Sequence, residues 1–379
     1  MSYALSEEQS LIQQVAREFA QEYVEPLAVE IDLKDEHPAE LLQNMGEHDF
    51  LGLFIPSEYG GADSDYLSYV LAVEEISRLS GSVGSILINH SSLAVYAINR
   101  WGSGQQKENY LPGMCQGKNI GSFAYAETGA APGVGSAKLV ATQEGNGYVL
   151  NGRKSYVANG GVADIYVVVA LTDPEAGMKG MSAFIVDATT PGLSVGRKIE
   201  KMGLRGCQST ELIFDNVQVT KENLLGAENQ GQAIIAEAYA VAAVAKGAQV
   251  VGITQAALED AVKYSQQRVQ FRRPISNFPA VQAMLARIAT NLHMTRLAVY
   301  HAAGLIDKGE PFAYEAAIIK NFVSEIGHSS LIEAIQVEGG YGYSRDMPVS
   351  RLFRDLKGTM IAETSEEYPI KTIAAGLLA

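Results

Sequence analysis

The sequence has few cysteines and no excess of positive charge. Its 379 residues include only two cysteines, Cys115 and Cys207, which lie far apart and in no CxxC or Cys/His cluster. That usage excludes a disulfide framework and argues against a zinc site. The net charge of −14 disfavours binding to nucleic acid or to an anionic membrane, because such partners require a positive face. We interpret the charge as a solvated acidic surface.

The sequence also lacks an uninterrupted apolar run of membrane-spanning length. The longest run, 233–253, contains Glu237 and Lys246. Charges are costly in hydrocarbon, so the run predicts a buried bundle helix. Residues 1–10 are followed by acidic and amphipathic residues rather than by the basic stretch and apolar core of a secretory signal. We expect a cytoplasmic protein that binds neither nucleic acid nor membrane.

Several catalytic motifs are missing. The sequence contains no GxSxG, HExxH or P-loop, and no GxGxxG that opens a helix after a strand, so it gives no support to a hydrolase, zinc-protease, NTPase or Rossmann function. The histidines have no close metal-ligand spacing, and we expect surface or satisfied core roles for them and no metal site. They are His37, His48, His90, His293, His301 and His328.

Periodicity divides the chain into helical, β and helical parts. A capping box at Ser6 and helical spacing predict an opening helix, and helical patterns follow at 38–50, 66–80 and 82–101. From about Gly121, short runs rich in Val, Tyr and Phe predict strands. These runs are 138–142, 147–151, 165–171, 182–186 and 211–214. After about Asn229 long helical patterns return at 233–256, 258–268, 280–308 and 311–338.

This order predicts an α+β fold with three domains. We expect an N-terminal helical domain at 1–120, a small central β domain at 121–228 and a C-terminal four-helix bundle at 229–379. With 47% hydrophobic residues, the chain can bury a sizeable core.

Two segments of the C-terminal part are suited to phosphate or cofactor binding. Residues 268–282 read RVQFRRPISNFPAVQ, and a guanidinium offers a bidentate fork to phosphate oxygens. Taken alone, a solvated basic turn explains this segment better. Residues 336–346 read QVEGGYGYSRD, where glycines either let the backbone approach a cofactor or simply end a helix.

Two more segments of the sequence are distinctive. Residues 202–219, MGLRGCQSTELIFDNVQV, form a strand pattern, and residues 354–367, RDLKGTMIAETSEE, contain Glu363. A glutamate in such a segment is ordinarily a solvated charge. Together with the order of domains, however, the four segments resemble the acyl-CoA dehydrogenase family over nearly the whole chain.

The resemblance implies an FAD-dependent flavoprotein that dehydrogenates an acyl-CoA thioester, or reduces it in the reverse direction. Glu363 matches the family's catalytic base, which would remove the α-proton while flavin N5 takes the β-hydride. Some members carry the base on a bundle helix, where this chain has Ala242. The resemblance also implies electron-transferring flavoprotein as a partner, and a homo-oligomer that is expected to be a tetramer.

The resemblance assigns further residues to the cofactor and to the substrate. The cofactor-binding candidates are Phe123, Tyr125, Ala126, Tyr156, Val157, Ala158, Arg268, Gln270, Phe271, Gln282, Gln336, Gly339, Gly340, Ser365 and Glu367. The candidates around the substrate are Ala240, Ala243, Lys246 and Ala362.

The chain departs from the family at the flavin and at CoA. Ala126, Pro132 and Ala158 stand where the family has hydroxyls that bond the flavin. Each lost bond either costs about 1 kcal/mol or shifts the redox potential, unless backbone N–H groups of the same loop, which Pro132 lacks, hold the ring instead. Ala240 and Ala243 replace an Asp and an Arg that help to hold CoA. Either CoA is held differently, with Lys246 as a candidate contact, or the acyl group is not carried on ordinary CoA. Ala362 replaces a bulky aromatic and indicates a cavity wide enough for a branched or ring-bearing acyl group.

Two other functions remain open. The altered flavin-binding loop at 126–133, AETGAAPG, fits a catalytically incomplete or half-site subunit of a hetero-oligomeric complex, in which a sister chain supplies much of the flavin site. A flavin oxygenase or oxidase on the same fold is less favoured, because Glu363 would then lack an evident role.

Overall fold

The N-terminal part of the molecule is a cluster of helices. The computed structural model describes residues 5–128, 138–361 and 367–378. The first helix begins at the expected capping box, in which Ser6 accepts from the backbone of Gln9. The helices are α1 (Glu7–Phe19), α2 (Ala28–Lys34), α3 (Ala39–Glu47), α4 (Tyr66–Leu79), α5 (Gly81–Ile88), α6 (Tyr96–Trp101) and α7 (Gly104–Cys115).

The single helix expected at 82–101 has a π-helical middle. Residues Asn89–Val95 form this turn between α5 and α6, and His90 in it is fully buried. The Nδ1 atom of His90 accepts from the backbone of Gly121 at 2.9 Å and Nε2 lies 3.2 Å from the carbonyl of Met114. Burial lowers the pKa of His90 to about 4, so this histidine is a neutral core residue that joins the helices to the first strand.

The middle of the chain forms a twisted sheet. Its hydrogen-bonded order is β6-β7-β3-β2-β4-β5-β8, and β1 pairs in parallel with β4. Every residue of β4 is buried, as expected of a strand in the interior of a domain. The strands are β1 (Gly121–Ala124), β2 (Val140–Glu144), β3 (Gly147–Ala158), β4 (Ile165–Leu171), β5 (Met181–Asp187), β6 (Leu193–Lys198), β7 (Ser209–Thr220) and β8 (Leu224–Leu225).

The C-terminal part is a bundle built around one long helix. The two helices expected at 233–256 and 258–268 are a single helix, and that prediction was wrong because no Gly or Pro interrupts the chain between them. The helices are α8 (Gly231–Gln267), α9 (Pro279–Asp307), α10 (Ala313–Ile318), α11 (Ser324–Glu338), α12 (Pro348–Ile361) and α13 (Glu367–Leu378). A short hairpin of β9 (Val269–Gln270) and β10 (Arg273–Pro274) joins α8 to α9.

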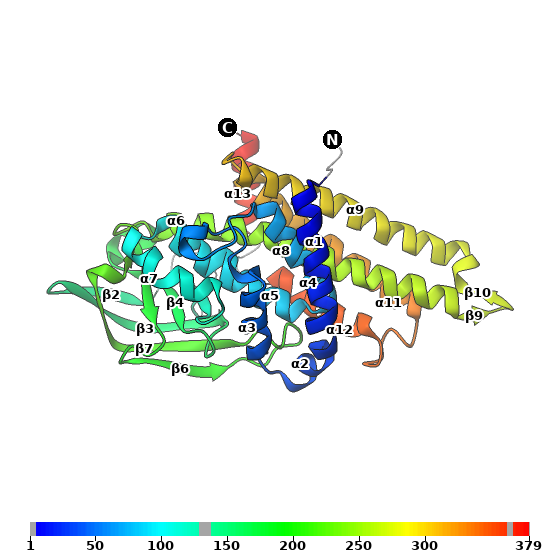
Figure 1. Ribbon diagram of the computed structural model, residues 1–379, viewed down its shortest axis with the longest axis horizontal. Coiled ribbons are helices and arrows are strands. Elements are labelled where there is room, and N and C mark those ends of the chain that lie inside the picture. The colour runs from blue at the N-terminus through cyan, green and yellow to red at the C-terminus, as the bar shows by residue number, and fades with distance from the viewer. Residues whose placement is uncertain (1–4, 129–137, 362–366, 379) are drawn as a thin grey trace.

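The whole molecule is elongated, with the sheet at one end and the β9–β10 hairpin at the other (Figure 1). In the described part of the chain, α8 is the helix that is long and apolar enough to cross a membrane, but 83% of its apolar window is buried inside the protein. It is therefore a core helix, as the charges within it indicated. The predicted order of helices, sheet and helices is confirmed.

Candidate functional site

The end of β1 packs against the first half of α8. The rings of Phe123 and Tyr125 lie with their centroids 5.8 and 5.9 Å from that of Tyr239 on α8. Phe123 and Tyr125 were expected from the sequence to bind the cofactor, whereas Tyr239 was not. The sheet and the bundle therefore meet at this aromatic cluster.

A bulge in β3 lies beside the end of β1. The register of β3 against β7 shifts between Lys154 and Val157, and Tyr156 within the shift has φ 54° and is 66% exposed. β-bulges often redirect a side chain at a functional site. The backbone of Ser155 donates to the carbonyl of Ala126 at 2.8 Å, and Ser122 Oγ donates to that of Ala158 at 2.6 Å. The structure thus brings together the cofactor candidates of β1 and those of β3.

A buried ion pair closes the base of the loop that follows β1. Glu127 Oε1 accepts from Lys154 Nζ at 2.6 Å, and both side chains are almost fully buried. The Glu127 carboxylate also accepts from the backbone N–H groups of Lys138 and Leu139, at 2.5 and 3.1 Å. Burial lowers the pKa of Lys154, and the Glu127 carboxylate opposes this shift. Glu127 therefore joins the two ends of the segment 129–137, and Pro132 in that segment lies outside the described residues.

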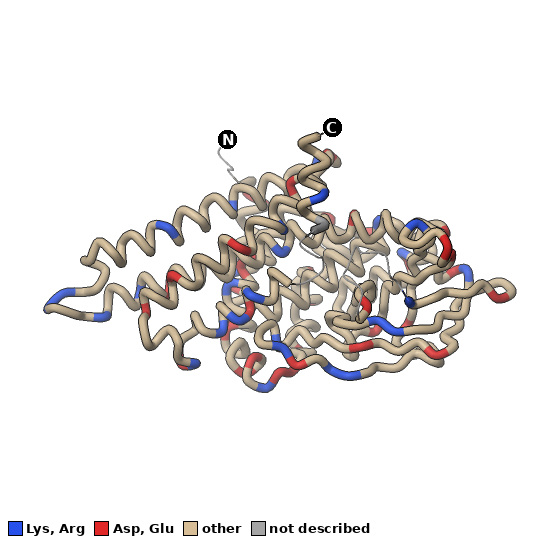
Figure 2. The backbone as a smooth tube through the Cα atoms, turned by 180° about the vertical axis from the view of Figure 1, so that it is seen from behind, with Lys and Arg blue, Asp and Glu red and all other residues tan. Residues whose placement is uncertain are grey.

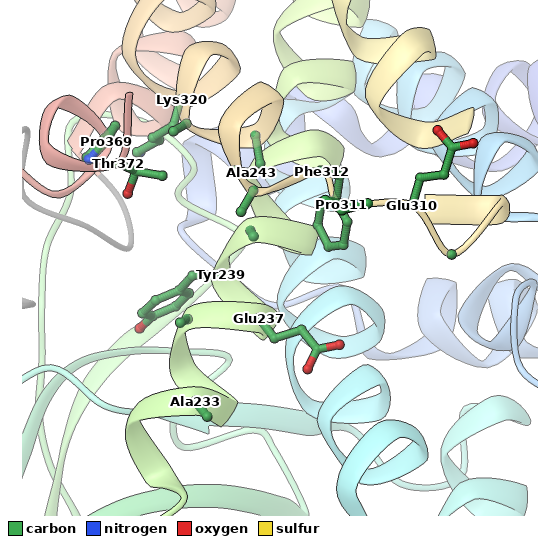
Figure 3. A pocket seen from close by; sticks show the side chains of 16 residues that line it. Ala233, Glu237, Tyr239, Ala243, Glu310, Pro311, Phe312, Lys320, Pro369 and Thr372 are labelled. Atoms are coloured by element: carbon green, nitrogen blue, oxygen red, sulfur yellow. The ribbon is translucent and has the colours of Figure 1, made fainter. Parts of the chain in front are cut away.

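A cavity of about 550 Å³ lies between α8, α10 and α13. Ala240 and Ala243, which were expected near the substrate, line it together with Tyr239. Figure 3 shows Phe312 and Pro311 on one side of Ala243, and Lys320, Pro369 and Thr372 on the other. Most of the wall is made of alanine and other apolar side chains, which suits an uncharged ligand.

The charges on the described wall of this cavity are two carboxylates and one ammonium. The carboxylate of Glu237 accepts hydrogen bonds from Arg100 Nε at 2.9 Å and from the hydroxyl of Tyr96 at 3.0 Å. The second carboxylate, that of Glu310, is exposed. Lys320 Nζ donates to the carbonyl of Thr359 at 3.0 Å, so the cavity wall is joined to the last turn of α12.

Lys246 does not line this cavity. It is 3% exposed, and its Nζ lies 3.2 Å from the hydroxyl of Ser85 on α5. The neighbouring Gln249 donates to the same hydroxyl at 2.9 Å. The structure therefore separates Lys246 from Ala240 and Ala243, which the sequence analysis had grouped with it.

Two contacts hold helix α12 in place ahead of Glu363, the residue expected to be the catalytic base. Arg354 forms a two-pronged ion pair with Asp32, at 2.7 and 2.5 Å. Asp355 accepts from the backbone of Leu204 at 2.6 Å, and burial raises its pKa to about 6. Glu363, Ala362 and Ser365 lie outside the described residues, as does the side chain of Glu367.

A second cavity, of about 590 Å³, lies at the far end of α8. Four residues from two distant motifs line it, namely Arg268, Gln270, Gly339 and Gly340. Gly339 has φ 63° and ψ −134°, a conformation that a side chain would strain, and a Cβ on Gly339 or Gly340 would meet nothing within 4 Å. An exposed guanidinium beside open glycine backbone fits a phosphate-bearing ligand.

Three other cofactor candidates lie near this cavity in sequence without lining it. Phe271 is 88% exposed, with its ring centroid 6.1 Å from that of Phe278. Gln282 donates to the carbonyl of Ser276 at 3.0 Å, and Gln336 is exposed on α11.

The two cavities are too far apart for one dinucleotide to reach both in a single chain. Tyr239 borders the first and Tyr264 the second. They are 25 residues apart on α8, or about 38 Å at 1.5 Å per residue, which exceeds the length of a dinucleotide. In Figure 1 the sheet and the β9–β10 hairpin lie at opposite ends of the molecule.

The described residues contain no group of three or more His, Cys, Asp or Glu side chains placed to hold a metal ion. Cys115 and Cys207 are buried, and neither forms a disulfide bond. The two cavities present aromatic rings beside amide, carboxyl, ammonium and guanidinium groups, which suit an organic cofactor.

Comparison with known families identifies three successive domains. Models for the N-terminal, middle and C-terminal domains of acyl-CoA dehydrogenase match residues 6–118, 122–217 and 229–378. An acyl-CoA dehydrogenase of Bacillus subtilis is 42% identical over 374 residues, which are 99% of each chain.

Two further similarities extend over the full length. A subunit of the caffeyl-CoA reductase-Etf complex of Acetobacterium woodii, CarC, is 36% identical over 98% of this chain and 99% of its own. The solved structure of butyryl-CoA dehydrogenase from Megasphaera elsdenii superimposes with a TM-score of 0.98 and 36% identity, over 100% of both chains.

Proposed function

The chain belongs to the acyl-CoA dehydrogenase family, and we propose that Glu363 is the base that removes the proton α to the thioester carbonyl. The protein is an FAD-dependent flavoprotein oxidoreductase of acyl-CoA thioesters that works by α,β-dehydrogenation or by the reverse reduction. When bound, FAD supplies the hydride acceptor or donor that no side chain provides.

One observation supports the role of Glu363. Lys320 lines the alanine-walled cavity and also bonds the carbonyl of Thr359, in the last turn of α12. Glu363 follows the last described residue of α12, Ile361, by two positions. A carboxylate in an apolar cavity is a stronger base than one in water, because burial raises its pKa and water no longer competes for it.

The cofactor site is proposed to be shared between two copies of this chain. The isoalloxazine would lie at the aromatic cluster of Phe123, Tyr125 and Tyr239, near the bulge at Tyr156. The adenine end would lie in the second cavity, beside Arg268, of a neighbouring copy. The separation of about 38 Å along α8 supports this homo-oligomer, and the tetramer and the cytoplasmic location stay predictions.

The acyl group is proposed to enter the alanine-walled cavity, with the CoA nucleotide held weakly. Neither Ala240 nor Ala243 offers a charge to CoA. Besides Glu237, which is paired with Arg100, the described wall presents one exposed carboxylate, Glu310, and one ammonium, Lys320. Electron-transferring flavoprotein is the proposed electron partner, as the CarC similarity supports.

The test is anaerobic mixing of the FAD-loaded protein with a panel of acyl-CoA thioesters, followed by flavin absorbance. We expect one class of thioester to bleach the flavin in the wild type and not in Glu363→Gln. Glu366→Gln, which changes a nearby carboxyl in the same way, should keep the activity. The matching acyl-pantetheine should bleach the flavin within about tenfold of the CoA rate, because the nucleotide contributes little binding energy.

Other outcomes would point to the rival functions. A protein that stays colourless with added FAD would instead be a half-site subunit, as the missing hydroxyls at Ala126 and Ala158 would allow. Bleaching that survives in Glu363→Gln would remove this residue from the mechanism. Rapid oxygen consumption without an electron acceptor would identify an oxidase.

A further inference from the structure

A buried carboxyl group faces the second cavity. Glu338 is the last residue of α11, is 2% exposed and lines the cavity beside Gly339. Apart from the carboxyl group of Asp260 on α8, neither of its carboxyl oxygens has a hydrogen-bond partner in the part of the chain that the structure describes. Oδ2 of Asp260 likewise has no partner there other than Glu338. Buried polar atoms are nearly always satisfied, so a missing ligand is the expected partner.

The two carboxyl groups interact through a proton. Ionised carboxylates only accept hydrogen bonds, so the pair can bond only when one of them is protonated. Burial, followed by the charge of Asp260, raises the pKa of Glu338 to about 8, and burial also raises that of Asp260. The other charged groups nearby are Lys263 on α8 and two residues of the cavity wall, Arg268 and Asp346.

This arrangement leaves one free acceptor. A proton between Glu338 and Asp260 occupies one oxygen of Glu338. Its second oxygen remains a neutral acceptor for an N–H group, which rules out a second carboxylate or a phosphate as its partner. Phosphate would instead bind Arg268, which forms no ion pair among the described residues.

The wall of the second cavity is suited to a flat nucleobase. The rings of Tyr264 and Tyr341 both line it, with centroids 6.3 Å apart and planes inclined by 50°. Aromatic side chains stack on nucleobases of any sequence, so an amino group on the base edge would supply the specificity. Figure 2 shows Lys and Arg at the tip of this end of the molecule, which suits attached phosphates.

We propose that Glu338 recognises the adenine base of the bound dinucleotide by accepting a hydrogen bond from its exocyclic amino group. This rests on the proposed function, because FAD is the dinucleotide that fills the cavity. Glu338 thereby makes the site selective for adenine over a base that carries a carbonyl at the same position, since two acceptors repel.

The experiment compares two flavin dinucleotides, FAD and its hypoxanthine analogue, in which the amino group is replaced by a carbonyl. The apoprotein is titrated with each, and binding is followed by flavin fluorescence. We expect the wild type to prefer FAD by about five- to tenfold, the effect of one hydrogen bond. Glu338→Gln should bind both equally well, because its amide can turn to accept or to donate. Glu338→Leu should lose the preference and bind FAD more weakly.

Matched controls separate this inference from others. Glu325→Gln removes an exposed carboxyl from the same helix and should keep the preference for FAD. Equal wild-type affinity for the two dinucleotides, or a preference that survives in Glu338→Leu, would overturn the role of Glu338 and leave the flavoprotein function intact. A wild type that binds neither dinucleotide would overturn both. If Glu338→Leu does not fold, the loss of preference in Glu338→Gln decides the question alone.

Discussion

The buried ion pair of Glu127 and Lys154 lies beside the two ends of the segment 129–137. We predict that Lys154→Met lowers the free energy of unfolding by about 3–5 kcal/mol, because it leaves the Glu127 carboxylate buried without its counter-charge. Urea unfolding followed by circular dichroism measures the change. FAD affinity should fall together with stability, since Glu127 also bonds the backbone of Lys138 and Leu139.

An exposed pair of the same type provides the control. Lys34 and Glu30 pair on the surface of α2, with both side chains about half exposed, so Lys34→Met should change stability by less than about 1 kcal/mol. Replacing both buried partners, in Lys154→Met with Glu127→Gln, should recover part of the loss. Equal effects at the buried and exposed pairs would contradict the prediction.

Glu338 gives the molecule a pH-dependent stability. Its pKa is raised from 4.5 to about 8 by burial and by Asp260, so the folded state holds a proton that the unfolded state releases. The stabilisation is complete below pH 4.5 and is lost as the pH rises to about 8. We predict that Glu338→Gln, which cannot ionise, is more stable than the wild type near pH 8 by roughly 1–3 kcal/mol. The difference in stability between Glu338→Gln and the wild type should disappear near pH 4.5, which melting temperatures measured across the pH range would show.

At the scale of the helices, close backbone contacts fix how α8 packs on α4. A Cβ on Gly252 would lie 2.1 Å from the carbonyl oxygen of Glu74, and backbone atoms there cannot move without separating the helices. We predict that Gly252→Ala destabilises the protein by about 1–3 kcal/mol, as overpacking does, although alanine favours helices. Gly304→Ala on α9, where a Cβ meets nothing within 4 Å, should instead stabilise by about 0.5–1 kcal/mol. Thermal unfolding of both variants tests the contrast.

The local patterns of the sequence were enough to predict most elements. The helical pattern at 66–80 predicted α4 within one residue, although the helix is buried on all sides from Tyr66 to Ser77. The π-helical turn at Asn89–Val95 was not predicted, since one shifted hydrogen-bond register leaves no mark on composition. Strand β6 was also not predicted, because its residues are largely exposed and lack a hydrophobic pattern.

The site was only partly predictable for a related reason. Arg268, Gly339 and Gly340 came from motifs, and the structure brings them to one cavity. Tyr239 and Glu338 were not predicted, because their roles depend on residues that are distant in sequence or on burial at a helix end. From the sequence alone, a glutamate between Val337 and Gly339 cannot be distinguished from an exposed surface charge, whereas in the structure Glu338 is buried.

At the scale of the whole molecule, the end that carries the second cavity also exposes aromatic side chains. Tyr343 is 89% exposed and Phe271 is 88% exposed, which is unusual for large apolar side chains unless a partner covers them. Both belong to the segments beside Arg268 and Gly340. A second copy of this chain over this end would agree with the proposed sharing of the cofactor site between two copies.

We therefore predict that Tyr343→Ser weakens the oligomer and FAD binding together. Removing a buried interface aromatic typically costs about 2 kcal/mol or more, so the variant should dissociate at concentrations at which the wild type remains assembled. Light scattering measures the mass, and the flavin spectrum measures retained FAD in the same fractions. Val195→Ser, which alters a 52% exposed residue on the sheet at the opposite end, should leave both unchanged. A dissociated Tyr343→Ser protein that still holds a full complement of FAD would show that each chain binds its dinucleotide alone.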